Sequence, residues 1–276
     1  MRIVFMGTPE FAVPSLKILL DNHQEVAAAV TVPDKPAGRG LQLSVSAVKQ
    51  YALNYRIPVL QPTRMRDESF IRQLTELKPD LFVVVAFRIL PPEVFSIPKL
   101  GAFNLHASLL PKYRGAAPIN WAIIRGEKET GVTSFFLREK VDTGNIILQA
   151  RVPIGSDETA GELHDKLADV GAEIVLHTVR LIEAGKISPK SQDEDLASLA
   201  PKIFKEDCKI DWQKPALDVH NLIRGLSPRP SAFTIYSGRS IKVYRTKIIA
   251  DNQNKTPGEI LCSDNQLIIQ TGNGAV

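Results

Sequence analysis

The sequence Leu-Phe-Val-Val-Val-Ala-Phe at residues 81–87 decides the fold of this chain. It is apolar throughout, whereas a strand with one face in water alternates apolar and polar residues. An uninterrupted apolar run of this length is typical of a parallel strand that is buried on both faces. Parallel strands are joined by crossover connections that usually contain a helix. We therefore expect strands and helices to alternate on both sides of this run.

The flanking sequence shows this alternation. The expected strands are residues 2–6, 26–32, 58–60, 101–106 and 131–137, and the expected helices are residues 11–21, 46–55, 67–77, 117–125 and 159–184. Strand-helix alternation around a buried strand predicts an α/β domain with a doubly wound, Rossmann-like sheet. The loop Gly7-Thr8-Pro9 lacks the second and third glycines of the dinucleotide-binding fingerprint, which argues against a nicotinamide enzyme.

The pattern changes after residue 185. Ser, Pro, Lys, Asp and Glu dominate residues 186–205, as in a linker. Beyond them follow an expected helix and four short β-type runs, at residues 217–226, 232–236, 240–247, 259–262 and 266–270. Short strands separated by turns are typical of a small barrel or a partly open antiparallel sheet. We therefore predict a first domain at residues 1–188, a linker at residues 189–204 and a second domain at residues 205–276.

Composition limits the class of protein. A length of 276 residues favours two domains, and 44% hydrophobic with 23% charged residues is ordinary for a globular protein. No run approaches the ~18–20 apolar residues that cross a bilayer, and residues 1–6 are too short for a signal-peptide core. Cys208 and Cys262 give neither a disulfide framework nor a metal cluster. We therefore expect unpaired thiols, a cytoplasmic location and no contact with membranes.

The net charge of +4 is unevenly distributed along the chain. Residues 1–200 carry 23 basic and 23 acidic side chains, whereas residues 201–276 carry 11 Lys and Arg against 7 Asp and Glu. The whole excess therefore lies in the last quarter. Such a bias suits contact with a phosphate backbone, and it suits a merely soluble surface equally well.

Three polar residues stand where an α/β sheet keeps its ligand sites. Asn104 and His106 end the expected strand at residues 101–106, and Asp142 follows the next strand in Val141-Asp142-Thr143-Gly144. Ligands of open α/β sheets bind outside the carboxyl ends of the strands. An amide and an imidazole can stabilise an oxyanion and move a proton, and a carboxylate can fix the imidazole tautomer. These are the needs of acyl transfer to an amine, although most lone histidines in proteins are structural.

Three motifs carry a resemblance to a known family. Residues 100–145, with Asn104-Leu105-His106-Ala107-Ser108-Leu109-Leu110-Pro111 and the segment around Asp142, resemble the 10-formyltetrahydrofolate-dependent formyltransferases. Met6-Gly7-Thr8-Pro9-Glu10-Phe11-Ala12 and Pro33-Asp34-Lys35-Pro36-Ala37-Gly38-Arg39-Gly40 resemble the branch that formylates methionyl initiator tRNA. The similarity runs from Arg2 to about Gly274. It implies a Rossmann-like formyltransferase domain and a smaller OB-like barrel that continues beyond Val276.

The resemblance also implies the site. Asn104, His106 and Asp142 would be catalytic, with 10-formyltetrahydrofolate as co-substrate and no metal. The folate would contact Ser108, Leu109, Leu110 and Pro111, and the backbone of the loop that contains Phe87, Arg88, Ile89 and Leu90. Many relatives carry Tyr-Gly where this chain has Phe87-Arg88. Glycine readily adopts a positive φ and arginine does not, so the backbone of this loop is expected to differ at Arg88 if the relatives have a positive φ there.

The loop at residues 33–40 is cationic through Lys35 and Arg39. Lys and Arg make charge-assisted contacts with phosphates, and Arg can also stack on bases. From the residues alone, a solvated surface loop is the alternative. In the family this loop inserts at the acceptor stem of initiator tRNA. The resemblance therefore implies that Lys35, Arg39 and the basic second domain bind methionyl initiator tRNA, and we expect a monomer.

The implied function is transfer of a formyl group from 10-formyltetrahydrofolate to the α-amine of methionine on initiator tRNA, a step of translation initiation. Two other functions remain open. A folate-dependent formyltransferase acting on a small amine, such as an amino sugar or glycinamide ribonucleotide, could use the same three residues. It would not need the cationic loop or the basic domain. A non-catalytic RNA-binding protein would leave Asn104, His106 and Asp142 without a purpose.

Overall fold

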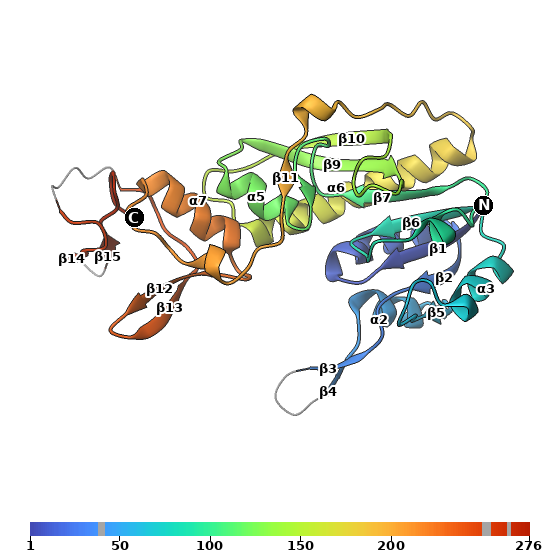
Figure 1. Cartoon of the computed structure of the whole chain (residues 1–276), viewed down its shortest axis with the longest axis horizontal. Coiled ribbons are helices and arrows are strands. Elements are labelled where there is room, and N and C mark those ends of the chain that lie inside the picture. Colours follow the sequence, from blue (N-terminus) through green and yellow to red (C-terminus); the bar gives the residue numbers. More distant parts are fainter. Residues whose placement is uncertain (38–41, 250–254, 264–265) are drawn as a thin grey trace. The chain divides into compact units, whose positions relative to one another are not determined.

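A computed structural model of the chain describes residues 1–37, 42–249, 255–263 and 266–276 (Figure 1). The chain forms two compact units. Unit 1 comprises Met1–Arg114, Gly131–Arg151 and Asp165–Ser198, and unit 2 comprises Gly115–Thr130, Val152–His164 and Leu199–Val276. Each unit is therefore assembled from three separate segments of chain. The domains expected from composition are instead continuous ranges, residues 1–188 and 205–276 with a linker between them, and these boundaries stay a prediction.

A seven-stranded sheet provides the framework of unit 1. Its strands, in spatial order, are β10 (Ile146–Pro153), β9 (Glu129–Phe136), β7 (Ala102–His106), β6 (Leu81–Val85), β1 (Arg2–Gly7), β2 (Glu25–Val30) and β5 (Val59–Leu60). The five strands from β7 to β5 are parallel, and β9 runs antiparallel to β7. Along the chain these five follow the Rossmann order, which reverses between β1 and β6. The expected doubly wound α/β sheet is confirmed.

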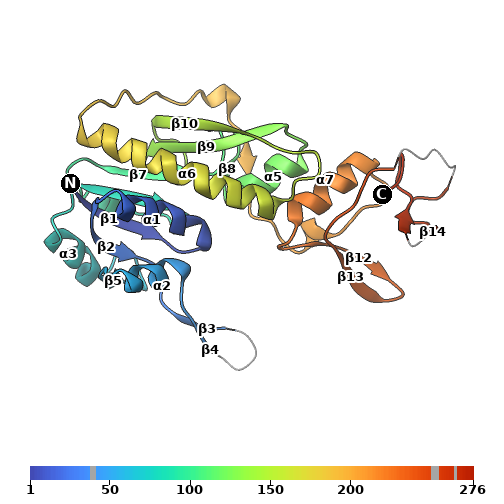
Figure 2. The same ribbon diagram turned by 180° about the vertical axis from the view of Figure 1, so that it is seen from behind.

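Helices of unit 1 lie on both faces of this sheet (Figures 1 and 2), whereas the helices at residues 118–124 and 216–226 belong to unit 2. The helices are α1 (Val13–Asp21), α2 (Ala47–Asn54), α3 (Glu68–Glu76), α4 (Pro92–Phe95), α5 (Pro118–Ile124), α6 (Ala160–Glu183) and α7 (Ala216–Leu226). Three short 3-10 helices cover Glu10–Ala12, Glu194–Leu196 and Glu206–Cys208. The helices expected at residues 11–21, 46–55, 67–77, 117–125, 159–184 and 217–226 are all present within two residues of these bounds.

The apolar run at residues 81–85 forms the fully buried strand β6. Phe82 and Val84 pack with Phe70 and Leu74 of α3 in one core cluster. Val85 pairs with Leu105 of β7 and therefore faces the other side of the sheet. There a Cβ added to Gly171 of α6 would lie 2.6 Å from Leu105 Cδ2, so the glycine permits the close approach of this helix. Burial by helices on both faces explains the unbroken apolar sequence.

Several elements were not expected from the sequence. Strand β10 is the edge of the sheet, and all but one of its residues are partly or fully exposed, so its pattern is mixed. Residues 33–40 were expected to form a loop, whereas β3 (Lys35–Ala37) pairs antiparallel with β4 (Gln42–Ser44). The short strands β8 (Arg114–Gly115) and β11 (Leu199–Ala200) were not expected either. Edge strands and short strands give weak periodic signals.

Unit 2 has its own core. Helix α5 packs on α7, and the Asn120 amide donates to the Gly225 carbonyl at 2.7 Å. Val219, Ile223 and Leu226 of α7 share a buried cluster with Cys208, which is an unpaired thiol as expected. The strands β12 (Ala232–Tyr236) and β13 (Arg239–Val243), and β14 (Ile260–Ser263) and β15 (Gln266–Ile269), form two separate two-stranded sheets among the described residues. The expected OB-like barrel is not confirmed.

Helix α6 begins with a capping box in unit 2. The backbone N–H of Thr159 donates to Glu162 Oε2 at 2.8 Å, and the Glu162 N–H donates back to Thr159 Oγ1 at 3.3 Å. The Thr159 N–H, followed by the Arg245 guanidinium, lowers the pKa of Glu162 from 4.5 to about 2. Glu162 therefore stabilises the fold fully above pH 4.5, and this contribution is lost as the pH falls toward 2.

We expect Glu162→Gln to lower the melting temperature slightly at pH 7, because glutamine keeps the cap geometry and loses only the charge. The side chain is 50% exposed, so solvent screening keeps the effect small. The difference from the wild-type chain should shrink as the pH falls from 4.5 to 2, as measured by thermal unfolding. A difference that stayed constant over this range would show that the charge contributes nothing.

Among the helices of the described ranges, none has the length and apolar character that a membrane crossing requires.

Candidate active site

Strand β7 places Asn104 and His106 on one face of the sheet. They are two residues apart, so both side chains point to the same side. His106 lies at the carboxyl end of the strand, opposite Thr133 of β9. Asn104 lies between Val84 of β6 and Phe135 of β9. The two residues therefore lie toward the carboxyl end of a parallel strand, one strand away from the point between β1 and β6 where the order reverses, and open α/β sheets bind ligands at this edge.

The tautomer of His106 is fixed by the backbone. Its side chain is 7% exposed, and Nε2 lies 2.8 Å from the carbonyl oxygen of Tyr113. A carbonyl oxygen can only accept, so Nε2 carries a hydrogen and donates it. The neutral ring therefore has its lone pair on Nδ1. Any proton that His106 takes up or releases moves at that atom.

Asp142 lies beside Nδ1 of His106. It follows β9 in a turn, with φ at 56°, and its Oδ2 lies 3.9 Å from Nδ1. That distance is too long for a hydrogen bond but short enough for an ion pair when the ring is protonated. The two side chains are only 7% and 10% exposed. We expected Asp142 to fix the tautomer of His106. The Tyr113 carbonyl does so instead, and Asp142 is placed to support the protonated ring.

Asn104 presents an unused amide. The residue is partly exposed, and its side chain makes no hydrogen bond within the part of the chain that the structure describes. Its neighbour on the same face is His106. An amide NH2 group and the Nδ1 atom of a protonated imidazole are both hydrogen-bond donors. Together they can hold an oxygen that becomes negative during acyl transfer.

The loop after β7 is held by hydrogen bonds to Thr133 and Gln149. Thr133 Oγ1 donates to the Ser108 carbonyl at 2.6 Å and accepts from the Leu110 N–H at 3.1 Å. Gln149 Nε2 donates to Thr133 Oγ1 and to the Leu110 carbonyl, both at 2.9 Å. These bonds position the loop that ends at Tyr113, and thus the carbonyl that orients His106.

Of the expected folate residues in this loop, two are buried. Ser108 is fully buried and donates its hydroxyl to the Lys112 carbonyl at 2.6 Å, and Leu110 is 3% exposed. Leu109 and Pro111 are partly exposed. The buried pair therefore shapes the loop, while Leu109 and Pro111 have apolar surface for a ligand.

The second expected folate loop follows β6. Ala86 has φ at 47°, so the positive φ falls one residue before the Phe87-Arg88 pair. Phe87 and Leu90 pack against the core cluster beside α3, and Ile89 is 71% exposed. The Arg88 guanidinium donates to the carbonyls of Pro62 and Thr63 at 2.7 and 3.1 Å and lies 5.3 Å from the Phe87 ring. This arrangement leaves backbone groups, rather than polar side chains, to contact a ligand.

The expected tRNA contacts are described in part. Lys35 is the exposed first residue of β3, and Arg39 lies outside the described residues. The root of the hairpin is held by Asp34, which accepts hydrogen bonds from Lys49 and Gln61 at 2.5 and 2.8 Å. These two donors hold the pKa of Asp34 below its usual value.

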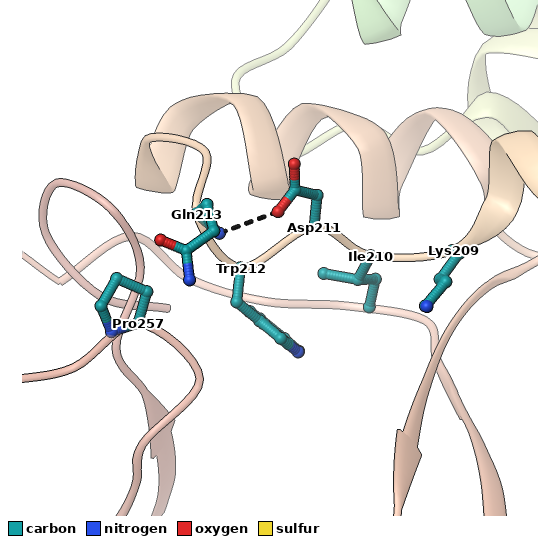
Figure 3. Close-up of a pocket in the computed structure, with 6 residues that line it drawn as sticks. All are labelled: Lys209, Ile210, Asp211, Trp212, Gln213 and Pro257. Carbon is teal, nitrogen blue, oxygen red and sulfur yellow. Dashed lines mark hydrogen bonds between the residues drawn. The ribbon is translucent and has the colours of Figure 1, made fainter.

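A pocket in unit 2 contains none of the expected site residues (Figure 3). Its lining residues are Lys209, Ile210, Asp211, Trp212, Gln213 and Pro257. The Trp212 indole donates to Thr234 Oγ1 at 3.0 Å and packs on the local core, which is a structural role. Within the described ranges, no group of three or more His, Cys, Asp or Glu residues could hold a metal ion.

The sequence did not point to Tyr113, Thr133 or Gln149. Tyr113 acts through its carbonyl, which every residue has, so no side-chain pattern could reveal it. Thr133 lies opposite His106 in the register of β7 and β9. This pairing was the one available signal, and it required the sheet order to be known.

Comparisons with known proteins agree with this geometry. A family model described as "Formyl transferase" matches residues 1–179, and one described as "Formyl transferase, C-terminal domain" matches residues 202–276. A methionyl-tRNA formyltransferase of Caldanaerobacter subterraneus subsp. tengcongensis is 48% identical, covering 100% of this chain and 90% of the relative. That of Acetivibrio thermocellus is 50% identical with the same coverage.

Among solved structures, the N-formyltransferase from Helicobacter canadensis, in complex with folinic acid and dTDP-3-aminofucose, is similar with a TM-score of 0.75. The match covers 99% of this chain and 96% of that protein, at 23% identity, and therefore supports the fold alone. Both family models and the full-length relatives lead to one conclusion. The chain belongs to the formyl transferase family, and its relatives at about half identity are methionyl-tRNA formyltransferases.

Proposed function

We propose that this chain transfers the formyl group of 10-formyltetrahydrofolate to the α-amine of methionine on initiator tRNA, giving N-formylmethionyl-tRNA for translation initiation. The observation that carries this proposal is identity of 48% and 50% along the whole chain to two methionyl-tRNA formyltransferases. The buried His106–Asp142 pair beside the Asn104 amide supplies groups suited to the chemistry.

The reaction makes one C–N bond and breaks another. The amine nitrogen attacks the formyl carbon, the bond from that carbon to N10 of the folate breaks, and the proton lost by the amine ends on N10. Nδ1 of His106 is free to take this proton, because Nε2 donates to Tyr113. The imidazolium beside Asp142 and the Asn104 amide then donate to the negative oxygen. Each well-placed donor lowers the barrier by ~2.7–4 kcal/mol.

We also assign the two substrates to different parts of the chain. Leu109, Pro111 and the backbone at residues 87–90 are proposed to contact the folate. Lys35 and Arg39 are proposed to contact the acceptor stem, together with a C-terminal domain that we propose completes an OB-like fold. Lys35 is exposed on a hairpin whose root is fixed by Asp34, which suits insertion against a nucleic acid.

Replacing Lys35 and Arg39 together with Ala should raise KM for methionyl-tRNA by about 10-fold and reduce its salt dependence, because two phosphate-binding charges are lost. KM for the folate should hardly change. Steady-state kinetics at several salt concentrations measure both values, with Lys78→Ala/Arg72→Ala as a charge-matched control. If KM for the folate rose by the same factor, Lys35 and Arg39 would be assigned to the folate site instead.

The small-amine alternative is tested by acceptor competition. The wild-type chain is given 10-formyltetrahydrofolate with methionyl initiator tRNA, a nucleotide-linked amino sugar, or glycinamide ribonucleotide. We expect transfer to the tRNA alone at micromolar acceptor. Preferential formylation of either small amine would overturn the proposal.

A further inference from the structure

Gln192 lies in the segment that composition marked as a linker, yet its side chain has a full set of partners. Its Nε2 donates to the backbone carbonyls of Asp142 and Gly144, both at 2.8 Å. Its Oε1 accepts from Nε and Nη2 of Arg114, at 3.1 and 2.7 Å. An amide has two donor hydrogens and two acceptor lone pairs, and all four are used. All three partners belong to unit 1.

These partners fix the orientation of the amide. A flipped amide would turn its oxygen toward two carbonyls and its NH2 toward a guanidinium, so each contact would become repulsive. Arg114 is itself held in place, because it is 7% exposed and its guanidinium also donates to both carboxylate oxygens of Glu194 at 2.8 and 2.9 Å. Gln192 therefore connects a fixed, buried arginine to the turn that carries Asp142.

That turn needs support. Asp142 adopts a φ of 56°, a left-handed conformation that residues other than glycine adopt infrequently. Its carboxylate acts on His106 across 3.9 Å, where a small displacement changes the interaction strongly. The same segment also holds the other partner of His106, since Ser198 Oγ accepts from the Tyr113 N–H at 2.9 Å.

We propose that Gln192 is a positioning residue, which holds the Asp142 turn so that the carboxylate faces Nδ1 of His106. This inference rests on the proposed function, because it assumes that Asp142 supports formyl transfer. The rival explanation is purely structural, with Gln192 merely attaching its own segment to Arg114. The two explanations differ in which end of the amide matters.

Two substitutions distinguish the Nε2 end of the amide, which contacts the Asp142 turn, from the Oε1 end, which contacts Arg114. Gln192→Ala removes both ends. Gln192→Glu keeps the acceptors that face Arg114 but sets a carboxylate against the carbonyls of Asp142 and Gly144. We expect each variant to lower kcat at least ~10-fold with KM for both substrates within about 2-fold, since misplacing a reacting geometry costs up to ~100-fold. In an Asp142→Asn background, Gln192→Ala should add no further loss, because its effect passes through that carboxylate.

A second readout does not depend on activity. Lys140, two residues before Asp142, is 77% exposed at its side chain, so trypsin can cut after it when the turn opens. We expect cleavage after Lys140 to be faster by ~10-fold in both variants, as followed by fragment mass. Asp193→Ala is the matched control: it removes an exposed cap in the same segment without touching the turn, and should match the wild-type chain in both assays.

The outcomes are distinct. A wild-type chain that fails to formylate methionyl-tRNA counts against the proposed function, and the cleavage assay still decides whether Gln192 holds the turn. Unchanged cleavage after Lys140, a Gln192→Glu variant with wild-type kcat, or additive losses with Asp142→Asn would each overturn the positioning role. If Gln192→Ala does not fold, Gln192→Glu, which keeps the Arg114 contact, decides the question.

Discussion

The Asp142→Asn variant should turn over at least ~100-fold more slowly than the wild-type chain, because asparagine keeps the volume and removes the charge that supports protonated His106. His106→Ala should lose at least as much, since it removes the atom that takes the proton. KM for the folate should stay nearly constant in both, as neither side chain is assigned to folate binding. Steady-state formyl transfer with each substrate varied in turn measures kcat and both KM values.

Glu139→Gln is the matched control for the charge. It makes the same change from carboxylate to amide at an exposed position three residues away, and should leave kcat within about 2-fold of wild type. Near-normal turnover of Asp142→Asn would remove Asp142 from the mechanism. The His106–Asp142 pair at 3.9 Å would then have no catalytic role.

The Thr133→Val variant should lose roughly 2–4 kcal/mol of unfolding free energy, because it leaves the buried Leu110 N–H and the Ser108 carbonyl without their partner. Valine has the same shape, so lost packing contributes little. The released loop carries the Tyr113 carbonyl that orients His106. We therefore also expect kcat to fall about 10-fold. Denaturant unfolding and formyl-transfer kinetics measure the two effects separately.

Thr178→Val provides the comparison for this experiment. Thr178 is equally buried, and its hydroxyl bonds with Ser134 Oγ and the Ile174 carbonyl at 2.7 Å each. It lies on α6, on the sheet face opposite His106. The Thr178→Val variant should therefore lose free energy of unfolding while keeping the kcat of the wild-type chain. If both variants lost kcat in proportion to stability, the Thr133 bonds would be structural only.

Much of the fold was predictable because burial leaves a periodic signal. The apolar run of β6 and the amphipathic helices have strong patterns, and the structure places each within a few residues of its expected range. Strand β10 and the hairpin at residues 35–44 were missed, since half-exposed and three-residue strands carry little periodicity. Polar composition predicts a linker at residues 189–204, and it carries no signal for the contacts that this segment makes. Its Lys190 pairs with Ile146 of β10, and Gln192 is fully bonded.

The candidate site also contains residues to which the sequence pointed and residues to which it did not. Asn104, His106 and Asp142 could be proposed from the sequence, because their side-chain types and their places at strand ends suit a known chemistry, and the structure places the His106 and Asp142 side chains 3.9 Å apart. Their supports could not. Tyr113 contributes a carbonyl, Thr133 depends on strand register, and Gln192 depends on a contact 50 residues distant in sequence. A contact of that separation appears only once the chain is folded.

The most direct test is single-turnover formyl transfer to methionyl initiator tRNA, with methionyl elongator tRNA as the comparison acceptor. The wild-type chain is mixed in excess with each tRNA and 10-formyltetrahydrofolate, and N-formylmethionine is quantified over time. We predict rapid formylation of the initiator tRNA, at least ~100-fold slower formylation by Asp142→Asn, and little product with the elongator tRNA. Absence of N-formylmethionine from a folded wild-type chain, or equal rates for wild type and Asp142→Asn, would contradict the proposed function or its mechanism, respectively.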